Sequence, residues 1–160
     1  MRPVLNRILT NAVIGLALLG FAFQVSAQAK VDDVWVRATV ANQSATGAFM
    51  TVTADSDSKL LSVTSPVARD VQIHEMTMSN DVMRMGPVAS VNLPAGKAVS
   101  FDPNGYHVML MGLTGQMKEG DSVALTLTVE NARGEQETVD VQAPVRALNN
   151  MDGRDHSKMH

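Results

Sequence analysis

The sequence contains no cysteine, and this absence excludes several kinds of chemistry. Without a thiol the chain forms no disulfide, carries no thiol redox centre and has no cysteine nucleophile. A blue-copper electron-transfer site is excluded as well, because such a site requires a cysteine thiolate as a ligand. The stability of the folded protein must therefore come from its hydrophobic core.

Positive charge is also scarce. The 160 residues carry 13 Lys and Arg against 16 Asp and Glu, a net charge of −3. Loss of Arg2 and Arg7 with an expected signal peptide lowers this charge to about −5, which argues against nucleic acid and anionic membranes as partners. The acids of Asp55-Ser56-Asp57-Ser58 lack the pattern of a calcium-binding loop, so this segment is predicted to be a solvated turn.

Residues 1–27 have the organisation of a secretory signal peptide. Two arginines precede an apolar run at residues 8–23, and Val25-Ser26-Ala27 offers small residues at a cleavage site. The apolar run is short for a membrane span and contains Asn11, which favours cleavage over an uncleaved anchor. The expected cut follows Ala27, or alternatively Ala29, so the mature protein is predicted to be exported.

The remaining sequence is predicted to form one β-domain at residues 28–147 and a flexible polar tail at 148–160. Apolar and β-branched residues alternate over short segments, which Gly, Pro, Asn and Asp separate. The pattern predicts about nine strands and no helix, as is typical of an all-β, antiparallel Greek-key β-sandwich. Its first strand is expected at residues 34–40, and a hairpin is expected around Ser79-Asn80-Asp81.

Histidine and methionine concentrate between His74 and Met111. This stretch holds two of the four histidines and six of the eleven methionines. Imidazole nitrogen and thioether sulfur form a ligand set that suits Cu(I), whereas zinc prefers Cys, His and carboxylate, and hard cations prefer oxygen. The sequence therefore predicts a site for Cu(I).

Four residues of this stretch are predicted to converge on one ion. His107 and Met109 are two apart on an expected strand, so they project from the same face. His74 and Met85 lie on the two arms of the expected hairpin, which can bring them together across the strands. If this hairpin packs beside the strand of His107, two imidazoles and two thioethers meet.

The other residues of interest receive structural interpretations or stay open. Met50 and Met117 are predicted to fill the core. Glu75 has the opposite strand parity from its neighbour His74, so it is interpreted as a surface charge and not as a general base. The roles of four methionines stay open: Met76, Met78, Met83 and Met111. They could shield the site, contact copper during transfer, or pack against other side chains.

The spacing His-x10-Met-x21-His-x-Met, formed by His74, Met85, His107 and Met109, resembles that of the periplasmic copper chaperone family PCuAC. The similarity covers nearly all of the mature domain and extends to Trp35-Val36-Arg37, His74-Glu75-Met76, residues 105–113 and Gly120-Asp121. It implies a cupredoxin-like sandwich that holds Cu(I) through the four motif residues. It also implies a role in cytochrome c oxidase assembly beside Sco-type proteins, and a second copper, Cu(II), on a tail with Met151, His156, Met159 and His160.

Two other classes of function stay open. A copper-dependent enzyme needs open coordination and usually more histidine, and the sequence has no recognisable Ser-His-Asp arrangement. A metal-free structural β-sandwich is opposed by the ligand motif itself. The prediction is a monomeric carrier and not an enzyme, which delivers Cu(I) to Sco-type chaperones or to the copper subunit of cytochrome c oxidase.

Overall fold

The computed structural model describes residues 29–147, which form ten β-strands and no helix within that range. The strands are β1 (Ala29–Arg37), β2 (Ala45–Ala54), β3 (Ser58–Thr64), β4 (Ala68–Ser79), β5 (Val82–Pro87), β6 (Val91–Leu93), β7 (Ala98–Phe101), β8 (Tyr106–Leu113), β9 (Ser122–Asn131) and β10 (Gln136–Arg146). The predicted all-β class is confirmed. The predicted signal peptide and tail lie outside the described residues. Residues 29–147 contain no helix that is long and apolar enough to cross a membrane.

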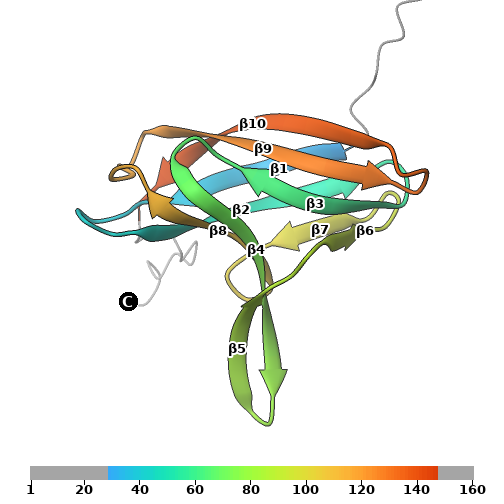
Figure 1. The fold of residues 1–160 in the computed structure, drawn as a ribbon, viewed down its shortest axis with the longest axis horizontal. Coiled ribbons are helices and arrows are strands. Elements are labelled where there is room, and N and C mark those ends of the chain that lie inside the picture. The colour runs from blue at the N-terminus through green and yellow to red at the C-terminus, as the bar shows by residue number, and fades with distance from the viewer. Residues whose placement is uncertain (1–28, 148–160) are drawn as a thin grey trace, which may run out of the picture.

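The ten strands join in one continuous open sheet, in the order β5-β4-β8-β7-β2-β1-β10-β9-β3-β6. This sheet folds into two layers, and Figure 1 shows β10, β9 and β3 lying across β1, β2 and β8. A short parallel pairing of β1 with β10, at Val36–Val145 and Arg37–Arg146, connects the layers. Apart from this pairing and one parallel contact of β7 with β8, the strands described here pair antiparallel.

The first strand begins and ends earlier than the predicted residues 34–40. It pairs with β2 on both sides of an irregularity between Asp32 and Trp35, where Asp33 has a φ of 49°. Residues after Arg37 leave the sheet, since the backbone N–H of Thr39 donates to the carbonyl of Met117. The alternation pattern at Val34–Val40 therefore continued past the point where pairing stops.

The hydrophobic core lies between the two layers and consists of alternate residues of each strand. In β8, Val108 and Leu110 are fully buried in this core, and the predicted core residues Met50 and Met117 are only 3% and 6% exposed. Successive side chains of a strand point to opposite faces. His107 and Met109 must therefore lie on the outer face of the layer that contains β1, β2 and β8, which is called the first layer below.

The β4–β5 hairpin extends from the body of the domain (Figure 1). Its turn consists of Asn80 and Asp81, whose φ angles of 51° and 62° lie in the left-handed region. Ser79 pairs with Val82 across this two-residue turn, which confirms the predicted hairpin. Left-handed angles at both turn residues match the right-handed twist of the strands, and Asn and Asp adopt them at low cost.

Candidate metal centre

Strand pairing places His74 and His107 beside each other. His74 of β4 pairs with His107 of β8, and Gln72 pairs with Met109 in the same register. Paired residues of antiparallel strands project to the same side of the sheet. The centroids of the two imidazole rings lie 5.8 Å apart on the outer face of the first layer.

The hairpin brings Met85 to the same face, but with a different partner from the one expected. The sequence suggested that His74 and Met85 approach each other across the strands near the turn. In the structure Pro87 lies opposite His74, and Met76 lies opposite Met85. The Asn80-Asp81 turn fixes the register, because Ser79 pairs with Val82 directly beside it. Three residue pairs further along the ladder, Met85 therefore pairs with Met76 and not with His74.

A cavity of about 460 Å³ opens on this outer face. Three of the four predicted ligands line it, namely Met85, His107 and Met109. Met76 and Met83, whose roles the sequence left open, line it as well. His74 is not part of the lining and stands beside it, next to the His107 ring.

His107 and Met85 direct donor atoms at each other. Nε2 of His107 lies 2.8 Å from Sδ of Met85, and Nδ1 lies 3.3 Å from the carbonyl oxygen of Gly105. A carbonyl oxygen only accepts, so Nδ1 carries the proton and Nε2 keeps its lone pair. His107 is 5% exposed and Met85 is 52% exposed, so an ion between these atoms would displace the flexible Met85 side chain.

A relay of polar side chains fixes His74 in a similar way. The amide nitrogen of Gln72 donates to Asp70 at 2.8 Å, which turns the amide oxygen toward Nε2 of His74 at 3.0 Å. Nε2 therefore carries the proton, and Nδ1 keeps its lone pair. Nδ1 is buried and has no hydrogen-bond partner among the described residues, so its lone pair can bind a metal ion.

Sequence reasoning missed Asp70 and Gln72. Their signal was present in the sequence, since both share the strand parity of His74 and stand four and two residues before it. Replacing Gln72 by leucine removes the hydrogen bond that selects the His74 tautomer. We expect the Cu(I) affinity in a chelator competition titration to fall about tenfold or more.

A matched control is available in the other layer. Gln142 of β10 is exposed and accepts a hydrogen bond from Ser122 at 3.1 Å. Gln142→Leu makes the same chemical change far from the histidines in the strand order, so it should leave the Cu(I) affinity as it is in the unaltered protein. Equal affinities for the two variants would show that Gln72 does not position His74.

The environment of His74 keeps its ring neutral at pH 7. Burial lowers the pKa of His74 below its usual 6.5, the electrostatic interaction with His107 lowers it further, and the carboxylate of Asp70 acts in the opposite direction. A neutral imidazole can act as a metal ligand, whereas an imidazolium cannot. The electrostatics of the site thus favour metal binding at neutral pH.

This shift has a measurable consequence for the metal-free protein. We expect the His74 ring, followed by NMR, to titrate with a midpoint below pH 6.5. Well above pH 6.5 His74 is neutral in both the folded and the unfolded chain. On acidification through pH 6.5 the unfolded chain takes up the proton first, so the free energy of unfolding decreases. Asp70→Asn should lower the midpoint further, and a midpoint at or above 6.5 would contradict this description.

An aromatic platform forms part of the cavity lining. The position of a Cβ atom on Gly47 would be only 2.8 Å from the ring of Phe49, so glycine lets the ring lie over the strand. Gly47 pairs with Met109, and the guanidinium of Arg37 lies 5.5 Å from the Phe49 centroid. Trp35 also packs against the Phe49 ring, with ring centroids 4.6 Å apart. These contacts hold the lining beside Met109 in place.

Oxygen-rich metal sites are not indicated. Residues 29–147 contain no group of three or more His, Cys, Asp or Glu side chains that could hold an ion. Glu75 pairs with Tyr106 on the face opposite to His74, as its parity predicted, and burial together with Glu75 raises the pKa of Tyr106. The residues that are brought together by the fold are therefore a histidine and methionine set, the set that fits Cu(I).

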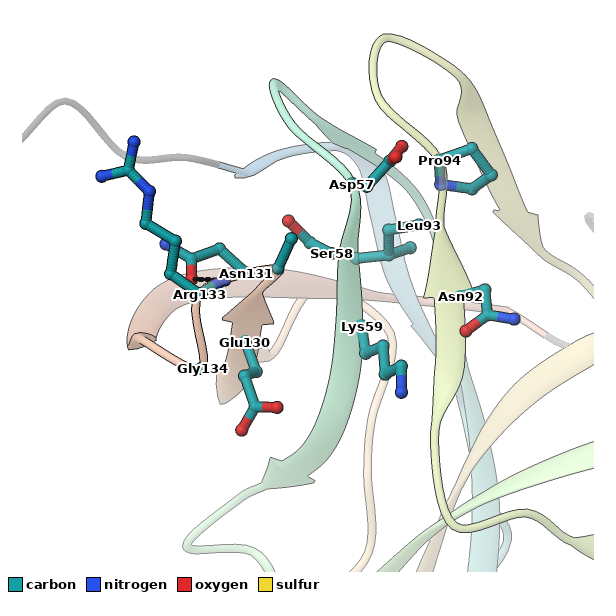
Figure 2. A pocket seen from close by; sticks show the side chains of 11 residues that line it. Asp57, Ser58, Lys59, Asn92, Leu93, Pro94, Glu130, Asn131, Arg133 and Gly134 are labelled. Carbon is teal, nitrogen blue, oxygen red and sulfur yellow. Dashed lines mark hydrogen bonds between the residues drawn. The ribbon is translucent and has the colours of Figure 1, made fainter.

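A second and larger pocket, of about 540 Å³, lies at β3, β6 and the turn after β9. Figure 2 shows that its side chains are mainly charged or polar, among them Lys59, Asn92 and Glu130. Its lining contains neither histidine nor methionine. It therefore has no ligand atoms of the kind that the outer-face cavity offers.

The fold and the histidine–methionine cavity together define a PCuAC-type domain with a cupredoxin-like β fold, which confirms the resemblance seen in the sequence. The chain belongs to the LpqE-like family, whose model, described as "Putative lipoprotein LpqE-like", matches residues 29–145.

Individual relatives agree with this assignment. "Putative lipoprotein Lxx21020" of Leifsonia xyli is 30% identical over 134 residues, which cover 77% of this chain and 81% of the relative. The "Copper-bound PCuAC domain from PmoF2" is 25% identical with a TM-score of 0.58, covering 75% of this chain and 93% of that domain. The Cu(I) form of DR1885 from Deinococcus radiodurans is 31% identical with a TM-score of 0.54, covering 83% and 89%.

Proposed function

We propose that the protein is an exported copper chaperone, which binds Cu(I) through His74, Met85, His107 and Met109 and passes it to other proteins. The observation that carries this proposal is the approach of His107 Nε2 to Met85 Sδ, 2.8 Å apart in a cavity that Met109 also lines. Further support comes from the solved relatives, of which one is copper-bound and another holds Cu(I).

The ligand chemistry suits a carrier. Four neutral ligands leave the site with the single charge of Cu(I), and thioethers hold this ion without forming disulfides in an oxidising compartment. Methionine ligands exchange without losing a proton, in contrast to cysteine. The half-exposed Met85 can leave the ion first, so copper can be transferred to an acceptor at the surface.

The cellular setting of this proposal follows from the family resemblance. The recipient would be a Sco-type protein or the copper subunit of cytochrome c oxidase, and the location would be the periplasm. Membership of a lipoprotein family is consistent with export. The tail residues proposed to take a second copper, Cu(II), lie outside the described residues: Met151, His156, Met159 and His160.

X-ray absorption of the Cu(I)-loaded protein tests the site directly. We expect one tightly bound ion with nitrogen and sulfur neighbours, and with no thiolate because the chain has no cysteine. The same measurement on a chain without residues 149–160 isolates the domain site from the tail. A chain that takes up no Cu(I), or that binds it through oxygen neighbours only, would refute the proposal.

A further inference from the structure

The β4–β5 hairpin exposes methionines outside the four proposed ligands, which are called the inner site below. Met78 is 68% exposed and Met83 is 50% exposed, and Met85 beside them is 52% exposed. Four of the five exposed large hydrophobic residues in the described chain belong to this hairpin: Met78, Val82, Met83 and Met85. Thioethers are therefore concentrated where solvent and other proteins have access to them.

The register of the hairpin sets these methionines in close cross-strand pairs. Met78 pairs with Met83, and Met76 pairs with Met85. Because the two-residue turn makes Ser79 and Val82 the first hydrogen-bonded pair, alternation makes both methionine pairs non-hydrogen-bonded ones. The backbone of Met76 supports this assignment, because its N–H donates at 3.2 Å to the carbonyl of Gly105, away from β5.

In non-hydrogen-bonded pairs the Cα atoms are only about 4.5 Å apart and the side chains lie closer than elsewhere in the ladder. Residues two apart on a strand also share a face, at a spacing of roughly 7 Å. The two methionine pairs thus lie on the same face as His74, one step after another along the hairpin. Flexible methionine side chains can reach across such a step.

The hairpin methionines lead from its exposed tip to a buried donor. Met78 is the most exposed, Met83 and Met85 are both about half-exposed, and Met85 contacts His107, which is 5% exposed. Met83 and Met85 also line the cavity. The series therefore connects solvent to the inner donor atoms through sulfur ligands alone. Simple packing does not explain it, because only β5 is paired with the part of β4 from Thr77 to Ser79.

We propose that Met78 and Met83 form an outer, weakly binding Cu(I) position through which copper reaches and leaves the inner site. This inference rests on the proposed copper-carrier function. Copper moves by ligand exchange: a thioether of the outer pair binds the ion as an inner ligand releases it. The ion stays monovalent and no proton is released, because thioethers are neutral in both states.

The test replaces both outer sulfurs without removing apolar surface. Met78→Leu/Met83→Leu of the full chain keeps the four proposed inner ligands, so the Cu(I) affinity at equilibrium changes far less than the rate of transfer. Transfer of Cu(I) to the chelator bathocuproine disulfonate, followed by stopped flow, slows at least about tenfold. Met50→Leu/Met117→Leu is the matched control, since both sites are buried in the core, and it transfers at the rate of the unaltered protein.

Direct occupancy of the outer pair is measured by NMR of labelled methionine methyl groups. The methyl signals of Met78 and Met83 shift when Cu(I) is added beyond one equivalent. Unchanged transfer rates in the leucine variant, with bound Cu(I) retained, overturn the outer position and leave the proposed function standing. An unaltered protein that binds no Cu(I) overturns both. If the double variant does not fold, Met78→Leu alone gives the same comparison at the most exposed position.

Discussion

Replacing His107 and Met109 together by alanine is expected to lower the Cu(I) affinity at least about 100-fold, the upper end of what the loss of a supporting residue costs. Both side chains line the cavity, and His107 directs its Nε2 lone pair at Met85. The double variant leaves only His74 and Met85 of the four proposed ligands. Competition titration against a chromophoric Cu(I) chelator measures the change.

Met111 offers a matched control for this double variant. It lies on the same strand, two residues after Met109, and pairs with Asp70 on the same face, but it does not line the cavity. Met111→Ala should therefore leave the Cu(I) affinity close to that of the unaltered protein. If the double variant binds Cu(I) as tightly as the control, the assignment of His107 and Met109 is wrong.

Replacing Leu60 by alanine is expected to cost about 2–5 kcal/mol of unfolding free energy. Leu60 lies on β3, is fully buried between the layers, and its truncation leaves a cavity that the packed strands cannot close. The loss matters because the whole free energy of unfolding of a domain of this size is only about 5–15 kcal/mol. Urea denaturation followed by circular dichroism measures it.

The neighbouring residue provides the comparison. Leu61 is only half-buried, at an irregularity in the pairing of β3 with β9, so Leu61→Ala should cost clearly less than Leu60→Ala. Neither leucine lines the histidine–methionine cavity, and the folded fraction of both variants should bind Cu(I) normally. Equal losses of stability for Leu60 and Leu61 would contradict the layer arrangement described here.

Much of the fold was readable from the sequence because strand signals are local. Alternation with a period of two, together with turn residues, predicted the hairpin around Asn80 and Asp81 and the strand that carries His107 and Met109. The first strand was placed too late in the sequence, because Val34–Val40 keeps alternating where no neighbouring strand remains to pair with it. Periodicity reports which residues suit a strand, but pairing decides where the strand ends.

The sequence by itself determined the chemistry of this protein. It excluded thiolate ligands, supplied the His and Met set, and showed through parity that His107 and Met109 share a face. Only the tertiary structure decided which side chains meet: the register from the hairpin turn sets Met76 opposite Met85, and β8 brings His107 to both His74 and Met85. Such contacts join residues distant along the chain, and they depend on strand order and register, which local patterns do not specify.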